Sequence, residues 1–254
     1  MGVMADDFGG EWNRDAAYHP WIVRVAAEHA GDVLDVGCGD GLLAQHLAPV
    51  SRTVTAIDRS GVAVAQASKR LAMVPNADAA TSEFSSEWGL VPASYDVVTM
   101  VSVLHELPLM PALERAASLL KPGGTLLVVG EAVPRGWLDV LLALLSAPYA
   151  WALRLFYTWR GIYRPEYRSA EPVAVSYALA DVEEAASLVL PGAELRRGLL
   201  GRFRLRWSKP VEIAPEAGEI SYVTGYDSAP FDGTAADGPG GDADTLVEWT
   251  SARN

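Results

Sequence analysis

A short glycine-rich segment places the tightest constraint on the fold of this chain. The apolar run Val33-Leu34-Asp35-Val36 leads without a break into Gly37-Cys38-Gly39-Asp40-Gly41. The apolar run predicts a buried strand, and the glycines predict a sharp turn with a ligand lying against its backbone. Helical spacing resumes at Leu42. A strand, a glycine loop and a helix in this order are typical of α/β domains that bind nucleotide-like ligands.

Apolar runs and helical segments alternate along the rest of the chain. The apolar runs predict buried strands, and the segments between them predict covering helices. The strands are expected at Asp32–Val36, Thr53–Ile57, Tyr95–Met100 and Thr125–Gly130, and the helices at Leu42–Ala48, Gly61–Ala72 and Ala112–Leu120. The pattern therefore predicts an α/β fold, a Rossmann-like doubly wound sheet that is mostly parallel.

Near the end of this pattern, two further runs lie too close together for a helix to fit between them. Ala193–Leu199 and Phe203–Trp207 flank Leu200-Gly201-Arg202, which is expected to form a turn. Two strands joined in this way form an antiparallel hairpin. We therefore expect an antiparallel C-terminal hairpin strand at the edge of the sheet.

The segments outside this pattern divide the chain into three predicted parts. Residues 1–30 are expected to form an N-terminal helical cap, and residues 31–210 the main domain, with a helical lid insertion at about 131–180 after the fifth strand. Residues 211–254 contain nine acidic residues, one arginine and no hydrophobic period, so we expect a disordered acidic tail. Because the tail holds most of the net charge of −12, the predicted folded part is close to neutral.

Composition argues against several functional classes. Cys38 is the only cysteine and the four histidines are scattered, so neither a disulfide framework nor a metal site is predicted. The first residues lack the basic and apolar stretches of a secretory signal, which makes a cytoplasmic location the expectation. Arg202, Arg204 and Arg206 alternate along a predicted strand as a solvated face does, and the chain is acidic, so no nucleic acid partner is expected.

The insertion contains the apolar run Trp137–Trp159. Asp139, Pro148 and Arg154 interrupt this run, so no stable membrane insertion is expected. Its aromatic and aliphatic side chains favour a lid over a partly hydrophobic small-molecule substrate. The alternatives are that they pack against the sheet or form a homodimer interface.

Two acids distinguish between the possible nucleotide-like ligands. Asp35 lies close to the loop, where it would repel a pyrophosphate and attract a cationic ligand with an amino acid and a sulfonium group. The glycine spacing also differs from the G-x-G-x-x-G of dinucleotide oxidoreductases. Asp58 follows the second strand, where a carboxylate can accept hydrogen bonds from both ribose hydroxyls. These features favour S-adenosylmethionine, and a dinucleotide-binding oxidoreductase remains the alternative.

From about Asp32 to Pro210, these motifs resemble the class I S-adenosylmethionine-dependent methyltransferases of the type 11/12-like group. The resemblance implies an enzyme in which the Asp35–Gly41 loop holds the methionine end of the cofactor and Asp58 holds the ribose. The stretch Asn76-Ala77-Asp78-Ala79 is similar to the segment after the family's third strand, which implies that Asp78 and Ala79 contact the adenine. Asp78 is alternatively a helix N-cap. The full set of expected cofactor contacts is Tyr18, Asp35, Gly37, Cys38, Gly39, Gly41, Asp58, Arg59, Asp78, Ala79 and Val101.

Two histidines are candidate catalytic bases for methyl transfer to an oxygen, nitrogen or carbon acceptor. His105 lies just after the fourth strand in a segment that resembles the Leu-His-His of small-molecule methyltransferases, with Glu106 in place of the second histidine. The base is therefore His105, Glu106 or neither. His19 lies in Trp12–Trp21, similar to the N-terminal Trp-Asn…Tyr-His-Pro segment of a bacterial methyltransferase subgroup. Tyr18 and His19 either contact the cofactor or the acceptor, or hold the cap on the domain.

His29 and His46 fall in predicted helices without acidic or cysteine partners at ligand spacing. We expect both to be structural. A protein that binds S-adenosylmethionine without catalysis remains a further alternative, because the cofactor loop and Asp58 alone do not require an acceptor.

Overall fold

The computed structural model describes residues 11–84, 89–131, 133, 148, 151–163, 177–198 and 202–211. Contacts group Met1–Glu212 into one unit, to which all of these residues belong. The expectations for residues 1–10, for most of the insertion at 131–180 and for the tail beyond residue 211 lie outside the described residues.

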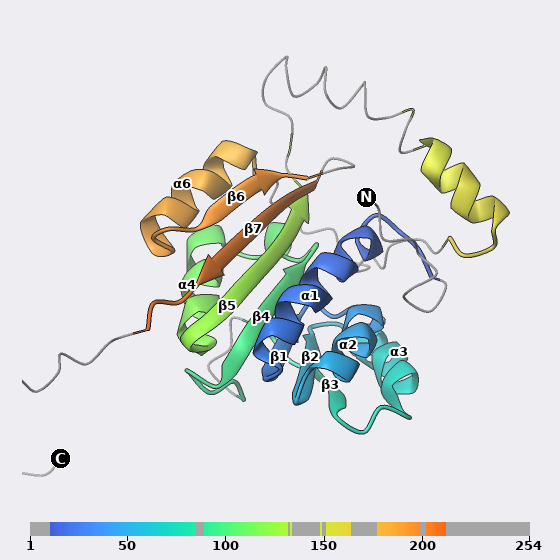
Figure 1. Cartoon of the computed structure of the whole chain (residues 1–254), viewed down its shortest axis with the longest axis horizontal. Helices are drawn as coiled ribbons and strands as arrows, with labels where there is room; N and C mark the ends of the chain where they lie inside the picture. Colours follow the sequence, from blue (N-terminus) through green and yellow to red (C-terminus); the bar gives the residue numbers. More distant parts are fainter. Residues whose placement is uncertain are drawn as a thin grey trace, which may run out of the picture. The chain divides into compact units, whose positions relative to one another are not determined.

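A sheet of seven strands forms the centre of the unit, in the order β3-β2-β1-β4-β5-β7-β6 (Figure 1). β1 to β5 pair in parallel, and β7 pairs antiparallel with both β5 and β6. The strand order reverses between β1 and β4, so the carboxyl ends of these two strands border a crevice. The strands are β1 Asp32–Val36, β2 Thr53–Asp58, β3 Ala77–Thr81, β4 Tyr95–Val101, β5 Leu120–Glu131, β6 Glu194–Arg197 and β7 Arg202–Ser208.

Helices cover both faces of the sheet. One apolar core contains side chains of α1, α2 and α3, and the other contains side chains of α4 and α6. Each helix buries one apolar stripe, as expected for a helix that lies on a sheet. Figure 1 shows the two groups on opposite sides of the strands. The helices are α1 His19–His29, α2 Leu42–Leu47, α3 Gly61–Leu71, α4 Leu109–Leu119 and α6 Leu179–Val189.

The predicted fold class is confirmed: the sheet is Rossmann-like and mostly parallel, with an antiparallel C-terminal hairpin. Two details differ. β3 has no counterpart among the predicted strands. Arg202, predicted to lie in the turn, is the first residue of β7, whereas Leu200 and Gly201 lie outside the described residues.

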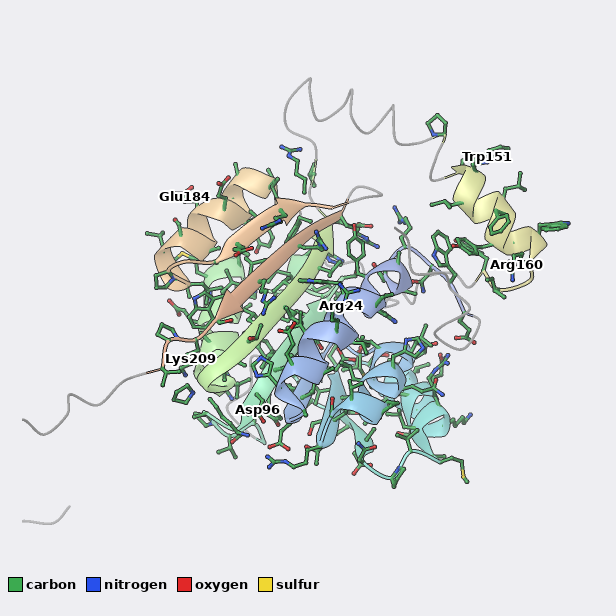
Figure 2. All side chains as sticks on the ribbon, in the orientation of Figure 1. Arg24, Asp96, Trp151, Arg160, Glu184 and Lys209 are labelled. Atoms are coloured by element: carbon green, nitrogen blue, oxygen red, sulfur yellow. The ribbon has the colours of Figure 1, made fainter. Side chains whose placement is uncertain are left out.

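The amino ends of the parallel strands lie at the end of the sheet opposite the crevice, and this end is called the amino edge below. Asp96, the second residue of β4, accepts a hydrogen bond from Lys121 at 2.7 Å, and Lys209 follows β7 at the same edge, since β7 runs antiparallel to β5. Both Asp96 and Lys209 are labelled in Figure 2. This edge is held by ion pairs and backbone contacts.

The N-terminal segment, which here means residues 11–19 up to the start of α1, contacts residues 151–163 of the insertion. Residues 151–159 are helical, and the indole of Trp12 stacks on Tyr157 with ring centroids 4.2 Å apart. The Trp12 amide donates to the Ile162 carbonyl at 2.8 Å. Trp151 and Arg160, labelled in Figure 2, lie near the two ends of this helical piece. None of the described helices is both long enough and apolar enough to cross a membrane.

Candidate active site

The glycine loop between β1 and α2 requires glycine for two separate reasons. Gly37 and Gly41 adopt φ values of 70° and 80°, in the left-handed region. A Cβ atom on Gly37 would lie 2.6 Å from Val103 Cγ2, and one on Gly41 would lie 2.9 Å from the Cβ of Ala67. The loop therefore packs closely on α3 and on the segment that follows β4, and it exposes backbone to the crevice where a side chain would otherwise project.

Asp58, the last residue of β2, holds this loop in place. Its Oδ2 accepts a hydrogen bond from the Gly39 amide at 3.0 Å, and its Oδ1 accepts one from the Ser60 amide at 2.8 Å. Each carboxylate oxygen has a second lone pair, so the group can still accept hydrogen bonds from a ligand. Asp58 thus fixes the cofactor loop and can bind a ligand at the same time.

Two cavities adjoin at Asp58. The loop cavity lies between the glycine loop and the N-terminal segment, and the Phe84 cavity lies on the other side of Asp58. Gly37, Asp58, Val103 and Glu106 line both. The loop cavity is lined further by Asn13, Asp15, His19, Asp35, Cys38, Gly39, Asp40, Leu42, Leu43, Val101 and Ser102. The Phe84 cavity is lined further by Val36, Ile57, Arg59, Ser82, Glu83, Phe84, Leu107 and Pro108.

Asp35 is a buried carboxyl group with one unused oxygen. Its Oδ1 accepts a hydrogen bond from Thr99 Oγ1 at 2.8 Å, and its Oδ2 has no hydrogen-bond partner among the described residues. Burial raises the pKa of Asp35 to about 7, with a smaller contribution from the charge of Asp58, although the Thr99 hydrogen bond opposes the shift. Since Asp35 lines the loop cavity, its free oxygen is suited to a cationic ligand.

Asp35→Asn should therefore stabilise the ligand-free protein at alkaline pH. An unfolded aspartate loses its proton near pH 4, whereas Asp35 in the folded chain loses it near pH 7. Between these values the unfolded state binds fewer protons, so Asp35 lowers stability as pH rises. Asparagine keeps the acceptor for Thr99 and removes this penalty. We expect the Tm gain of Asp35→Asn to be near zero at pH 4 and about 5 °C or more at pH 8.

The measurement is thermal unfolding of both proteins across this pH range without ligand. Asp32→Asn is the matched control, because Arg52 above all holds the pKa of Asp32 below its usual range and its charge stabilises the fold. The control should lower Tm at pH 8. A pH-independent gain for Asp35→Asn would contradict the raised pKa.

The loop cavity is strongly acidic. Five of its lining residues are carboxylates (Asp15, Asp35, Asp40, Asp58 and Glu106), and the described lining contains no lysine or arginine. Arginines outside the lining contact three of these carboxylates: Arg70 contacts Asp40 at 2.7 Å, Arg202 contacts Asp15 at 2.6 Å, and Arg59 contacts Glu106 at 3.4 Å. Such a cavity attracts cations and disfavours anionic ligands.

The Arg202 side chain is buried, although the sequence pattern predicted that it would be exposed to solvent. The alternation of Arg202, Arg204 and Arg206 predicted a solvated strand face, but the Arg202 side chain is 2% exposed. It contacts Asp15 of the N-terminal segment and, at 2.7 Å, Glu131 at the end of β5. Asp15 also accepts a hydrogen bond from Ser102 Oγ at 2.8 Å. The guanidinium thus joins the N-terminal segment to the rim of the sheet.

His19 lies in the wall of the loop cavity. Its side chain is buried at the start of α1, and its Nδ1 lies 3.0 Å from Nδ1 of His46 in α2. Burial, followed by the influence of His46, lowers the pKa of His19 to about 3. His19 is therefore neutral at neutral pH.

The structure brings most of the predicted cofactor residues together. Asp35, Gly37, Cys38, Gly39, Asp58 and Val101 line the loop cavity, and Arg59 lines the Phe84 cavity. Gly41 shapes the loop, because its amide donates to the Cys38 carbonyl at 2.9 Å. These predicted residues therefore lie around the two adjoining cavities.

Asp78 and Ala79 do not reach this site. They lie inside β3, whose carboxyl end is at Thr81, and neither is in the described lining of the loop cavity or the Phe84 cavity. Ser82, Glu83 and Phe84 follow the strand and line the Phe84 cavity instead. Ala77, Asp78 and Ala79 thus lie in the strand itself rather than in the segment after it, and Glu83 is the acid that follows the strand and lines the Phe84 cavity.

Tyr18 and His105 also lie outside both cavities. The Tyr18 side chain is buried, and a Cβ atom on Gly198 would lie 2.4 Å from its hydroxyl, so the ring packs against the hairpin. His105 Nε2 lies 4.0 Å from Glu106 Oε1, and its Nδ1 is buried without a partner among the described residues. Glu106 lines both cavities and lies 3.4 Å from Arg59. Of the two residues, only Glu106 faces the site.

Known proteins share both the sequence motifs and the fold. A methyltransferase domain family matches residues 34–126. An uncharacterised methyltransferase of Mycobacterium bovis is 32% identical over 207 residues, which cover 79% of this chain and 98% of that protein. A ubiquinone biosynthesis O-methyltransferase of Albidiferax ferrireducens is 35% identical over 132 residues, 51% of this chain and 52% of that protein.

Solved structures agree at the level of fold. A putative methyltransferase of Bacillus halodurans has a TM-score of 0.53 at 17% identity, covering 76% of this chain and 99% of that one. The N-methyltransferase NodS of Bradyrhizobium japonicum, in complex with S-adenosyl-L-homocysteine, also has a TM-score of 0.53 at 17% identity, covering 78% and 89%. With the glycine loop, Asp58 and the strand order, these matches show that the chain belongs to the class I S-adenosylmethionine-dependent methyltransferases.

Proposed function

We propose that this methyltransferase binds S-adenosylmethionine across the two adjoining cavities and methylates a small, partly hydrophobic molecule. The observation that carries the proposal is the unpartnered Oδ2 of Asp35 in an acidic cavity beside the glycine loop. The methionine end, with its ammonium and sulfonium charges, suits this cavity. Asp58 at the junction suits the ribose, and the cavity lined by Phe84, Arg59 and Glu83 suits the adenine.

The enclosure of the loop cavity supports a small acceptor. Asn13, Asp15 and His19 of the N-terminal segment form part of its wall opposite the glycine loop. Trp12 in turn stacks on Tyr157 of the insertion, so apolar surface lies next to the cap. When bound, the cofactor supplies an activated methyl group, and the residues of the chain position the acceptor and exclude water.

A hydroxyl acceptor is favoured among the oxygen, nitrogen and carbon possibilities. The match to ubiquinone biosynthesis O-methyltransferases supports this choice, although it covers about half of this chain. The acidic cavity is compatible with a neutral phenol or an amine and disfavours a phosphate or carboxylate beside the cofactor. Nucleic acid is not an expected acceptor for the same reason.

The test has a binding arm and a turnover arm. S-adenosyl-L-homocysteine should raise Tm by several degrees at a concentration of 100 Kd, which corresponds to about 2.7 kcal/mol, whereas NAD should not. With S-adenosylmethionine, catechol or tyramine should give S-adenosyl-L-homocysteine, and total RNA or denatured protein should not. Product formation from the macromolecules alone would contradict the proposal of a small acceptor. Binding without turnover by any acceptor would favour a non-catalytic role.

A further inference from the structure

The pair His19–His46 connects the loop cavity with the surface of the domain. His19 is buried and lines the cavity, and His46 is partly exposed in the last turn of α2. The two Nδ1 atoms lie 3.0 Å apart, and the rings meet edge to face with an interplanar angle of 71°. A proton on the cavity side of His19 therefore has a short path toward solvent through two imidazoles.

Only one of the two facing nitrogens can carry the hydrogen when both rings are neutral. If His19 Nδ1 carries it, His46 Nδ1 accepts, and Nε2 of His19 keeps a lone pair. Within the described part of the chain, the His19 side chain makes no hydrogen bond other than the one to His46. Nε2 is therefore available to a group in the cavity.

Position along the helices determines which ring tolerates a positive charge. His19 is the first residue of α1, where the helix dipole disfavours a cation, and it is buried. His46 is at the carboxyl end of α2, where a cation is favoured, and it reaches solvent. A proton accepted by His19 is thus more stable once the charge has moved to His46.

We propose that His46 is a positioning residue that holds His19 as the Nδ1–H tautomer, so that Nε2 of His19 takes the proton from the methyl acceptor. This rests on the proposed function. As the acceptor oxygen or nitrogen forms its bond to the methyl carbon, the carbon–sulfur bond breaks and its electron pair stays on sulfur. The acceptor proton moves to Nε2, the Nδ1 proton moves to His46, and His46 releases a proton to water. Exchange with water after product release restores the starting tautomers.

The carboxylates around the cavity assist this transfer. Asp15, Asp40, Asp58 and Glu106 line the same cavity as His19, and negative charge in the cavity favours the short-lived imidazolium. Glu106 also contacts Arg59 at 3.4 Å. The proposal thus assigns proton removal to His19, and it gives His46 a role that the sequence did not suggest.

The first test is spectroscopic and needs no acceptor. In the full-length protein with ¹⁵N-labelled histidine, imidazole nitrogen shifts at pH 7 should show His19 protonated at Nδ1 and unprotonated at Nε2, with S-adenosyl-L-homocysteine bound. His46→Phe should convert a substantial fraction of His19 to the other tautomer, and His46→Asn, whose amide oxygen can accept from Nδ1, should restore the original one. A wild-type His19 protonated at Nε2 would overturn the proposal.

The second test is kinetic, with catechol as the probe acceptor. His46→Phe should lower kcat about tenfold without changing KM for S-adenosylmethionine, and His46→Asn should recover most of the rate. The expected loss is smaller than the roughly 100- to 10,000-fold effect of a general base, because His19 itself is still present. His29→Asn is the matched control: His29 is at the other end of α1, lines neither cavity and contacts Thr125 Oγ1 at 2.9 Å. It should keep kcat even if Tm falls.

The two tests separate the two proposals. Two results would overturn the His46 assignment and leave the proposed function intact. In the first, the wild-type protein methylates catechol although its His19 is protonated at Nε2. In the second, His46→Phe and His29→Asn lower kcat by the same factor. If His19 is protonated at Nδ1 as expected but the protein methylates no small acceptor, the description of the imidazole pair stands and the proposed function is contradicted.

Discussion

Asp58→Ala is expected to weaken binding of S-adenosyl-L-homocysteine by roughly 10- to 150-fold, or about 1.5–3 kcal/mol. Two losses add up. The ribose loses a charged hydrogen-bond acceptor, and the Gly39 amide loses its 3.0 Å bond to Oδ2, which frees the glycine loop to move. Isothermal titration calorimetry measures the change in affinity directly.

Asp58→Asn separates these two losses. An asparagine carbonyl oxygen can replace one of the two acceptors, for Gly39 or for Ser60, but the amide carries no charge and its NH₂ cannot accept. We expect Asp58→Asn to fall between the wild type and Asp58→Ala. Asp78→Ala is the control, because Asp78 lies on β3 away from both cavities, and it should leave affinity unchanged. Equal affinities for Asp58→Ala and the wild type would rule out the assignment of Asp58 to the ribose.

The sequence was most informative where the backbone itself makes the site. The loop from Asp35 to Gly41 combines an apolar strand with glycines whose φ values and close contacts exclude other residues. Such constraints are local, so a short motif reveals them. Asp58 could be predicted in the same way, because it directly follows an apolar run and neighbouring parallel strands end at one edge.

The third strand could not be located by hydrophobicity. Ala77–Thr81 contains alanines, an aspartate and a threonine, and it pairs only with β2 at the edge of the sheet. An edge strand of small residues lacks the apolar run by which buried strands are recognised. Asp78, predicted to follow the third strand, consequently lies within it, and Glu83 is the acid that follows the strand and lines the Phe84 cavity.

The contacts of Arg202 and His46 depend on residues far away in the sequence. Arg202 contacts Asp15, which lies near the opposite end of the domain in sequence. His46 contacts His19 because α1 and α2 pack on the same face of the sheet. Alternation along a strand says which side a residue faces, but not whether another segment covers that side. The N-terminal segment covers Arg202, and this turns a predicted solvent-exposed arginine into a buried one.

Arg202→Met should lower the free energy of unfolding by about 3 kcal/mol, the lower end of the range for removing one partner of a buried ion pair. The side chain is 2% exposed, and its loss leaves Asp15 without its cation at 16% exposure. Glu131, at 43% exposure, is better solvated and adds less to the cost. Affinity for S-adenosyl-L-homocysteine should also fall, because Asp15 and its neighbours wall the loop cavity.

Arg206→Met provides the matched control on the same strand. Arg206 is 40% exposed and pairs with Glu28 at 3.3 Å, an exposed contact whose loss should cost less than about 1 kcal/mol. Urea denaturation of both variants, with Asp15→Asn alone and combined with Arg202→Met, gives the coupling between Arg202 and Asp15. We expect a coupling of at least 1 kcal/mol, because the neutral amide relieves the buried charge that Arg202→Met leaves behind. If Arg202→Met is as mild as Arg206→Met, the guanidinium does not hold the N-terminal segment on the sheet, and other contacts of this segment, such as the hydrogen bond from Ser102 to Asp15, hold the wall of the loop cavity.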